Sequence, residues 1–166
     1  RGGAIGLERE EMLDLAIVIV NYNTREDLNN CLHSIARSEG AFSYQVVVVD
    51  NYSSDGSAAM VRAKHPWVEP LIVSDHNGGY AYANNLGLRA LGLGADAAAD
   101  DLPRYVLLLN PDTILPPQAL DEMLAYLDAH PDVGVAGPKL VRRDGSLDKA
   151  CRRSFPSPSV SFYRMV

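Results

Sequence analysis

The sequence predicts an α/β protein in which helices flank a mostly parallel sheet. Two observations carry this prediction. Short apolar runs recur along the chain, and amphipathic segments separate them, as in successive β-α-β units. The runs at 15–20, 45–49 and 105–109 are continuous and rich in valine, isoleucine or leucine, which is typical of strands that are buried on both faces. We therefore expect right-handed crossovers and ligand binding beyond the carboxyl ends of the strands.

The first part of the chain contains two strand–helix pairs. The strand at 15–20 is followed by Thr24 and Asp27 in a capping-box pattern. A helical stripe of apolar residues follows at Leu28, Cys31, Leu32 and Ile35. The strand at 45–49 leads to a second helix, which opens at 55–57 and ends before Pro66.

The rest of the chain continues this alternation. A third strand at 68–73 is interrupted by Pro70, which disfavours a central position in a sheet. We then expect a helix at 80–91, a mobile acidic loop at 92–103, a strand at 105–109, a helix at about 120–127 and a fifth strand at 133–137.

Composition narrows the function classes. The chain has 166 residues, of which 47% are hydrophobic and 22% charged, so it is an ordinary globular chain. Its net charge of −6 argues against a nucleic-acid partner. Cys31 and Cys151 have neither metal-ligand spacing nor a disulfide framework, and no signal peptide or membrane span is visible. We expect a loose tail or expression remnant at 1–11, a ligand-binding domain at 12–141, and the truncated start of a further region at 142–166.

Polar clusters follow four predicted strands. They are Asn21-Tyr22-Asn23, Asp50-Asn51 with Asp55, Asp75 with Asn77-Gly78-Gly79, and Asn110-Pro111-Asp112. Any one of them is explained by turn chemistry alone, but Asp50 and Asp112 both follow fully apolar strands and face one crevice. The chain has no P-loop and no dinucleotide fingerprint.

Carboxylates at such an edge favour a nucleoside diphosphate held through a divalent cation. A carboxylate repels phosphate unless a cation lies between them, and Mg²⁺ or Mn²⁺ takes one or two carboxylates together with substrate phosphates. Tyr22 offers a flat face on which a base can stack. Asp50 or Asp55 can accept hydrogen bonds from a pyrimidine or a ribose.

Five sequence blocks, in this order, resemble one family. They are Val18–Asn23, Val48–Ser57, Asn77–Asn85, Leu108–Asp112 and Val133–Lys139. Together they resemble the family 2 glycosyltransferases of GT-A fold, and especially their rhamnosyltransferase-like branch. The resemblance covers about residues 15–155. It implies that this chain is the nucleotide-binding half of a longer catalytic domain.

The resemblance also implies roles for individual residues. The donor-binding set is Asn21, Tyr22, Asn23, Asp50, Asp55, Asn77, Gly78, Gly79, Asn84, Asn85 and Asn110. Asp112 is the implied ligand of Mg²⁺ or Mn²⁺, at the second acidic position of the family's Asp-x-Asp motif. Asn110 replaces the first aspartate of that motif and lowers the negative charge of the site.

The implied reaction is an inverting, metal-dependent sugar transfer. The donor would be dTDP-rhamnose or a UDP-sugar, and the acceptor a saccharide or lipid-linked saccharide in surface polysaccharide synthesis. The implied location is cytoplasmic, with peripheral association at the inner face of the membrane. Asp144 and Asp148 flank an exposed hairpin, so the general base is expected in sequence beyond Val166. A sugar-nucleotide pyrophosphorylase and a non-catalytic nucleotide- or carbohydrate-binding module are the alternatives.

Overall fold

The computed structural model describes residues 12–94, 98, 101–142 and 144–148. The chain divides into two compact units, residues 1–121 and residues 122–166. The predicted tail at 1–11, five residues of the predicted loop at 92–103 and most of the region at 142–166 lie outside the described residues. The described remainder of that loop forms turns and a short 3₁₀ segment.

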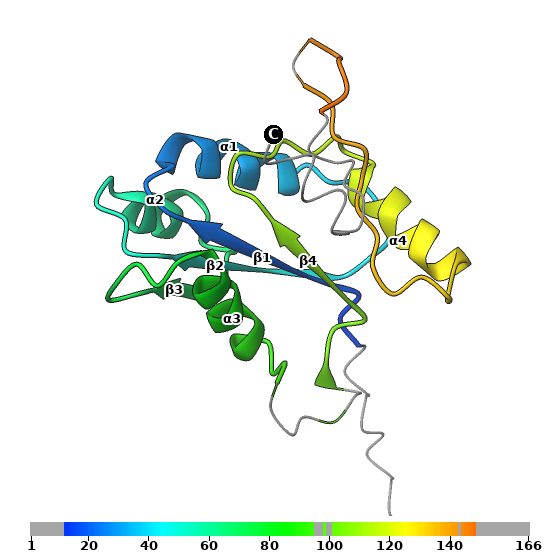
Figure 1. Cartoon of the computed structure of the whole chain (residues 1–166), viewed down its shortest axis with the longest axis horizontal. Coiled ribbons are helices and arrows are strands. Elements are labelled where there is room, and N and C mark those ends of the chain that lie inside the picture. The colour runs from blue at the N-terminus through cyan, green and yellow to red at the C-terminus, as the bar shows by residue number, and fades with distance from the viewer. Residues whose placement is uncertain (1–11, 95–97, 99–100, 143, 149–166) are drawn as a thin grey trace, which may run out of the picture. The chain divides into compact units, whose positions relative to one another are not determined.

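The first unit contains a parallel sheet, as the sequence predicts, and this sheet has four strands (Figure 1). Its strands are β1 (Leu15–Asn21), β2 (Tyr44–Asp50), β3 (Leu71–Val73) and β4 (Tyr105–Leu109), in the order β3-β2-β1-β4. β1 and β2 are completely buried along their apolar stretches. In the register, Asn21 lies opposite Asp50 and Asp50 lies opposite Val73, so the polar residues after these strands meet at one edge.

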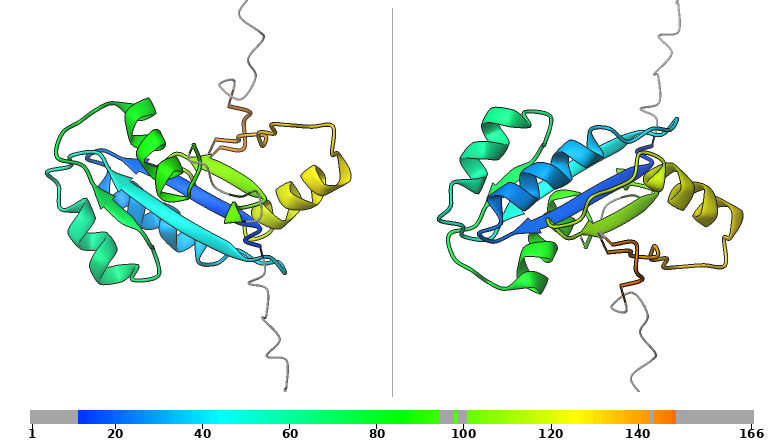
Figure 2. Two further views of the ribbon diagram at one scale, coloured as in Figure 1. Left: turned by 90° about the horizontal axis from the view of Figure 1, so that it is seen from below. Right: turned by 90° about the horizontal axis from the view of Figure 1, so that it is seen from above.

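The four predicted helices are present. They are α1 (Arg25–Ile35), α2 (Ser57–Lys64), α3 (Tyr80–Ala90) and α4 (Ala119–Ala129). α1 and α2 lie together on one face of the sheet and α3 lies on the other (Figure 2). α2 ends one residue before His65-Pro66, because the residue that precedes a proline disfavours the helical region.

The core consists of two apolar layers on either side of the sheet. Val18, Val47 and Val49 form a buried cluster with Ala83 of α3. The alternate side chains of β1 and β2 point to the opposite face, where α1 contributes its buried apolar stripe. α3 approaches the sheet closely at Gly87, where an added Cβ would lie 2.5 Å from a methyl carbon of Val18.

Two of the strand predictions need correction. The predicted fifth strand at 133–137 is wrong: these residues form no strand, and Val135 is 92% exposed. The segment contains two glycines, which weaken strands, and no neighbouring strand in the described residues pairs with it. The third strand is shorter than predicted, because β3 begins at Leu71, directly after the cis Glu69–Pro70 bond.

The expected hairpin near residue 145 is present in the second unit. Val141 and Leu147 form an antiparallel bridge, and Gly145 turns with a φ of 80°. The Asp144 carboxylate accepts hydrogen bonds from the amide and the hydroxyl of Ser146. These bonds hold the pKa of Asp144 below its ordinary value.

Candidate functional site

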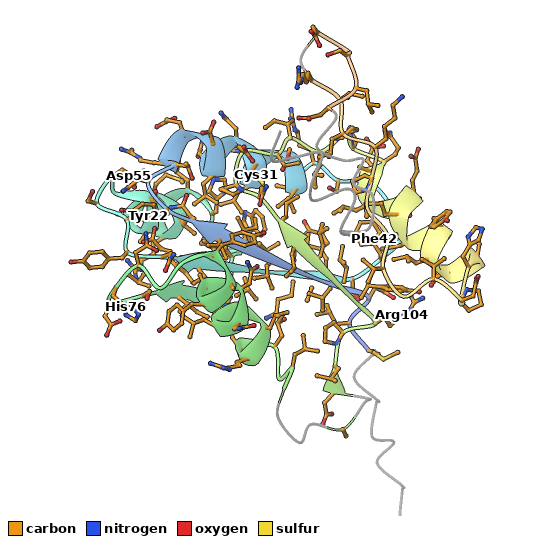
Figure 3. The ribbon with its side chains drawn as sticks, in the orientation of Figure 1. Tyr22, Cys31, Phe42, Asp55, His76 and Arg104 are labelled. Carbon is orange, nitrogen blue, oxygen red and sulfur yellow. The ribbon has the colours of Figure 1, made fainter. Side chains whose placement is uncertain are left out.

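The site lies at the topological switch point of the sheet, where the order of the strands reverses. From β1 the chain adds β2 and β3 on one side, and it then returns to place β4 on the other side of β1. Loops from adjacent strands therefore diverge between β1 and β4, and open α/β sheets bind ligands there. Tyr22 and Asp55 lie at this carboxyl end of the sheet, while Arg104 lies at the opposite end (Figure 3).

A buried polar network forms the floor of this edge. The amide nitrogen of Asn21 donates to the Asp50 carboxylate at 3.1 Å and to the Ser53 hydroxyl at 3.0 Å. The other oxygen of Asp50 accepts from the backbone N–H of Ser53 at 2.8 Å. Asn21 and Asp50 are 0% and 1% exposed. Their side chains therefore hold the loops in place and do not face solvent.

Thr24 does not cap α1 in the way its sequence pattern predicts. Its hydroxyl donates to the side-chain oxygen of Asn21 at 2.7 Å, and it makes no capping bond to the helix. The cap comes instead from Asp55, whose carboxylate accepts the N–H of Arg25 at 2.9 Å. Asp55 thereby holds the α1 N-terminus against the loop after β2.

Asp55 also holds the start of α2. Its second oxygen accepts hydrogen bonds from the amide and the hydroxyl of Ser57. Burial acts to raise the pKa of Asp55, but the bonds from Ser57 and from the Arg25 amide outweigh it and lower that pKa. Both oxygens of this predicted donor-binding residue are therefore engaged inside the protein.

Two residues of the loops above the floor adopt left-handed backbone conformations. Asn23 has a φ of 53° and Tyr52 a φ of 72°. Asn23 is fixed by a bond from its N–H to the Ser53 hydroxyl and by one from the Ser54 N–H to its side chain. Between Asn21 and Asn23, Tyr22 is exposed, as a stacking role requires.

The turn before α3 is attached to the end of β2 by amide side chains. Asn51 donates to the Asn77 side chain at 2.8 Å and accepts the N–H of Gly78 at 3.2 Å. Asn77 in turn accepts the N–H of Gly79 at 3.0 Å. A Cβ at Gly78 would collide with the ring of Tyr82, so this turn requires glycine.

The N-terminus of α3 is open at this edge. Its N-cap residue, Gly79, has a φ of 83° and supplies no side-chain cap. N–H groups in the first turn of a helix lack intrahelical partners, and the helix dipole favours an anion beside them. Further along α3, Asn84 is buried and donates to the Tyr80 carbonyl, whereas Asn85 is exposed.

The loop after β4 completes the edge. Asn110 and Asp112 are exposed, and the Asn110 side chain accepts a hydrogen bond from the Tyr80 hydroxyl at 3.3 Å. Below them, the Cys31 thiol lies 3.8 Å from the Asn110 carbonyl. Burial and the nearby Asp112 carboxylate raise the pKa of Cys31 to about 12, so this cysteine is a neutral packing residue.

A divalent ion fits this edge only together with a ligand that supplies oxygens. Among the described residues, no group of three or more acidic, histidine or cysteine side chains could hold a metal. Asp112 offers one exposed carboxylate, and Asn110 adds a neutral oxygen that Tyr80 already contacts. Mg²⁺ binds in proteins through one or two carboxylates plus substrate phosphates, so the donor set suits a metal–diphosphate complex.

The structure thus brings the predicted residues to one edge but gives them different surroundings. Asn21, Asp50 and Asn84 are buried and Asp55 is half-buried; the exposed members are Tyr22, Asn23, Asn77, Gly78, Gly79, Asn85, Asn110 and Asp112. Sequence reasoning placed Asn51 in a polar cluster without giving it a role, and it missed Ser53 and Tyr80. Their position in the sequence could have identified them, because each lies within or beside a polar cluster that follows a strand.

Another hollow lies away from this edge. It has a volume of about 430 Å³ and is lined by Asn30, His33, Ala36, Arg37 and Ile114. It contains none of the predicted site residues and no carboxylate. We therefore assign the site from the sheet topology and not from this hollow.

The fold and this edge define an α/β domain of the class that binds a ligand at a topological switch point. The model of the glycosyl transferase family 2 matches residues 16–164. The chain therefore belongs to glycosyl transferase family 2, as its five sequence blocks indicate.

Two curated relatives have related names. An "N-acetylglucosaminyl-diphospho-decaprenol L-rhamnosyltransferase" of Mycobacterium tuberculosis is 29% identical over 84% of this chain and 45% of its own length. A "low-salt glycan biosynthesis hexosyltransferase" of Haloferax volcanii is 34% identical over 92% of this chain and 44% of its own length. The chain thus spans less than half the length of these relatives.

Solved structures share the fold. Staphylococcus aureus TarS in complex with UDP-GlcNAc has a TM-score of 0.57 at 24% identity, over 71% of this chain and 32% of that one. A Pyrobaculum calidifontis mannosyltransferase in complex with GDP-Man and Mn²⁺ has a TM-score of 0.53 at 24% identity, over 70% of this chain and 32% of that one. At this identity the likeness establishes the GT-A fold. In the described part of the chain, no helix is both long and apolar enough to cross a bilayer.

Proposed function

We propose that this chain is the nucleotide-sugar-binding part of an inverting glycosyltransferase. One observation carries the proposal: an exposed aromatic ring, an uncapped helix N-terminus and an exposed carboxylate gather at the switch point of the sheet. They are Tyr22, the first turn of α3, and Asp112. These three groups match the base, the phosphates and the metal of a nucleoside diphosphate.

Different residues of the chain contact different parts of the nucleotide. Tyr22 stacks on the nucleobase, while Asn21 and Asp50 fix the loop that carries it. The Gly78–Gly79 turn leaves room for the diphosphate beside the α3 N-terminus. Asn110 contributes a side-chain oxygen that can accept a hydrogen bond from the ribose.

Asp112 and phosphate oxygens of the donor would hold Mg²⁺ or Mn²⁺. Such an ion neutralises the charge that develops on a departing nucleoside diphosphate. Because the described loop after β4 supplies a single exposed carboxylate, that of Asp112, we expect weak binding of the ion alone and strong mutual enhancement between ion and nucleotide.

The general base belongs to another part of the protein. A base must reach the acceptor hydroxyl within hydrogen-bond distance. The Asp144 carboxylate is occupied by Ser146 in its hairpin, and Asp148 lies in the same hairpin. We place the base in sequence beyond Val166, in the half of the relatives that this chain does not span.

The names of the relatives support particular donor and acceptor classes. A rhamnosyltransferase that acts on a diphospho-decaprenol substrate supports dTDP-rhamnose and a lipid-linked saccharide acceptor for this chain. A UDP-sugar is the second choice, because a structural neighbour holds UDP-GlcNAc. A lipid-linked acceptor would place the enzyme at the inner face of the cytoplasmic membrane, in peripheral association.

Calorimetric titration tests the proposal. The chain is titrated with dTDP, UDP and GDP, each with and without Mn²⁺. We expect metal-dependent binding of a pyrimidine diphosphate. Asp112→Ala should remove the metal dependence, while Asp144→Ala, a change at an exposed carboxylate in the hairpin, should leave it intact. Equal affinity with and without metal in the wild type would reject the metal site.

A second variant tests the base contact. Base–aromatic stacking contributes about 1–3 kcal/mol, so Tyr22→Ala should weaken nucleotide binding by that amount. Tyr22→Phe keeps the ring and should bind the nucleotide as the wild type does. An unchanged affinity for Tyr22→Ala would remove Tyr22 from the site.

A non-catalytic nucleotide-binding module is the second candidate. The replacement of the first motif aspartate by Asn110 favours it, because fewer carboxylates weaken metal binding. Nucleotide binding that does not depend on metal, together with no sugar transfer by the full-length protein, would support the module.

A further inference from the structure

We infer that Tyr52 is a second aromatic contact for the nucleobase, in addition to Tyr22. This inference deepens the proposed function and rests on it. It begins from a conflict between the residue type and the backbone conformation at position 52.

The backbone at Tyr52 is of the kind that a tyrosine adopts at a cost. Its φ of 72° lies in the left-handed region, where Cβ crowds the following carbonyl. Glycine adopts this conformation without that cost, and asparagine does so more readily than an aromatic residue.

Hydrogen bonds on both sides of Tyr52 enforce this conformation. The N–H of Asn51 donates to the Asn21 carbonyl at 2.8 Å, and the N–H of Ser53 donates to the Asp50 carboxylate at 2.8 Å. The Ser53 hydroxyl is in turn fixed by bonds from Asn21 and Asn23. The loop therefore requires a left-handed residue at this position, whatever its side chain.

The ring of Tyr52 serves no visible purpose within the fold. It is 59% exposed. Among the described residues it makes no contact with another aromatic ring, and its hydroxyl has no hydrogen-bond partner. Strained backbone that persists without a packing benefit is typical of a binding site, so we look for the partner of this ring outside the protein.

The position of Tyr52 indicates that partner. Asn21 and Asp50 are paired in the sheet register, and neighbouring strands lie about 4.8 Å apart. Tyr22 follows the first of these strand ends by one residue, and Tyr52 follows the second by two. Two exposed tyrosines thus follow the ends of adjacent strands at the carboxyl edge of the sheet. Aromatic faces bind a nucleobase by stacking, whichever base it is, because every base has a flat π-face.

The test measures separately what the Tyr52 side chain costs in fold stability and what it contributes to nucleotide binding. Tyr52→Gly, Tyr52→Asn and Tyr52→Phe are compared with the wild type in thermal melts and in titrations with UDP or dTDP in Mn²⁺. We expect Tyr52→Gly and Tyr52→Asn to melt no lower than the wild type, because their backbones tolerate the turn. The same two variants should bind the nucleotide at least about fivefold more weakly, at the lower end of the range for stacking, and Tyr52→Phe should bind normally.

Each other outcome overturns the inference. Nucleotide affinities for Tyr52→Gly and Tyr52→Asn within twofold of the wild type would mean that the ring does not contact the base. A clearly lower melting temperature would mean that the ring stabilises the fold. Inorganic diphosphate with Mn²⁺ is the control ligand, and an equal loss of its affinity would assign the effect to the phosphates. A wild type that binds no nucleotide would overturn the proposed function as well, whereas the preceding outcomes leave it standing.

Discussion

Replacing Asn21 by aspartate should destabilise the protein in a pH-dependent way. In the wild type the Asn21 side chain donates to the Asp50 carboxylate at 3.1 Å, and both residues are buried. Asn21→Asp keeps the shape of the side chain but places a second carboxylate at that distance. At an effective dielectric constant of 20, two such charges repel by about 5 kcal/mol. The repulsion exceeds the cost of binding one proton, so we expect the folded pair to take up a proton.

The cost of that proton sets the size of the effect. An aspartate with an unfolded pKa of about 3.9 is protonated at a cost of 1.36 kcal/mol per pH unit above it. Asn21→Asp should therefore lower the free energy of unfolding by about 4 kcal/mol at pH 7 and by about 1.5 kcal/mol at pH 5. Below pH 4 the shared proton restores a hydrogen bond between the two groups, and the difference from the wild type should nearly vanish.

Urea denaturation of the two proteins at pH 7, 6 and 5 measures this difference. Asn85→Asp on the exposed face of α3 is the matched control, and we expect it to change the free energy of unfolding by less than about 0.5 kcal/mol at each pH. A loss for Asn21→Asp that is the same at pH 7 and pH 5 would refute the reasoning. It would mean that the two carboxylates separate in the variant, or that the floor of the edge is wetter than its burial indicates.

Three further predictions concern packing and titration. Gly87→Val should lower the free energy of unfolding by about 1–3 kcal/mol, because its side chain would overlap Val18. Gly87→Ala should lower it less, because the helix propensity of alanine offsets part of the clash, and urea denaturation of both variants measures this. Burial and the nearby His33 and Lys64 lower the pKa of His65, so stability should be full above its unfolded pKa of about 6.5 and fall as pH decreases through the lower folded pKa, a slope that His65→Gln should reduce. Cys31 should react with a thiol reagent at pH 8 only at the rate of unfolding, because its pKa is about 12 and it is buried; rapid labelling of Cys31 itself, as distinct from Cys151, in the native protein would contradict this.

The sheet could be predicted because its strands are local and unambiguous. β1 and β2 each contain at least four consecutive apolar, mostly β-branched residues that are buried on both faces, and no other element accommodates that pattern so well. The segment at 133–137 carries a similar but weaker signal. Two of its five residues are glycine, and a strand exists only where a neighbour completes its hydrogen bonds, which sequence alone does not reveal.

The site could be predicted in position but not in detail. That polar residues gather at the carboxyl edge follows from strand order. Which of them face solvent does not, because this depends on bonds between loops about 30 residues apart. Asp55 illustrates the point: it was expected to bind base or ribose, yet its oxygens cap α1 through Arg25 and hold Ser57. Its role toward a ligand stays a prediction.

The return of the chain to place β4 beside β1 has a consequence for how the protein folds. The ion pair between Arg104 and Asp14 at the start of these strands closes a loop of 90 residues, whereas β1, β2 and β3 are joined through much shorter connections. Long-range pairing is entropically costly and slow. The edge that holds Tyr22 and the α3 N-terminus should therefore form early, and Asp112 should join it last. In a chain that has folded only this far, the groups proposed for the base and the phosphates would be in place before the proposed metal ligand.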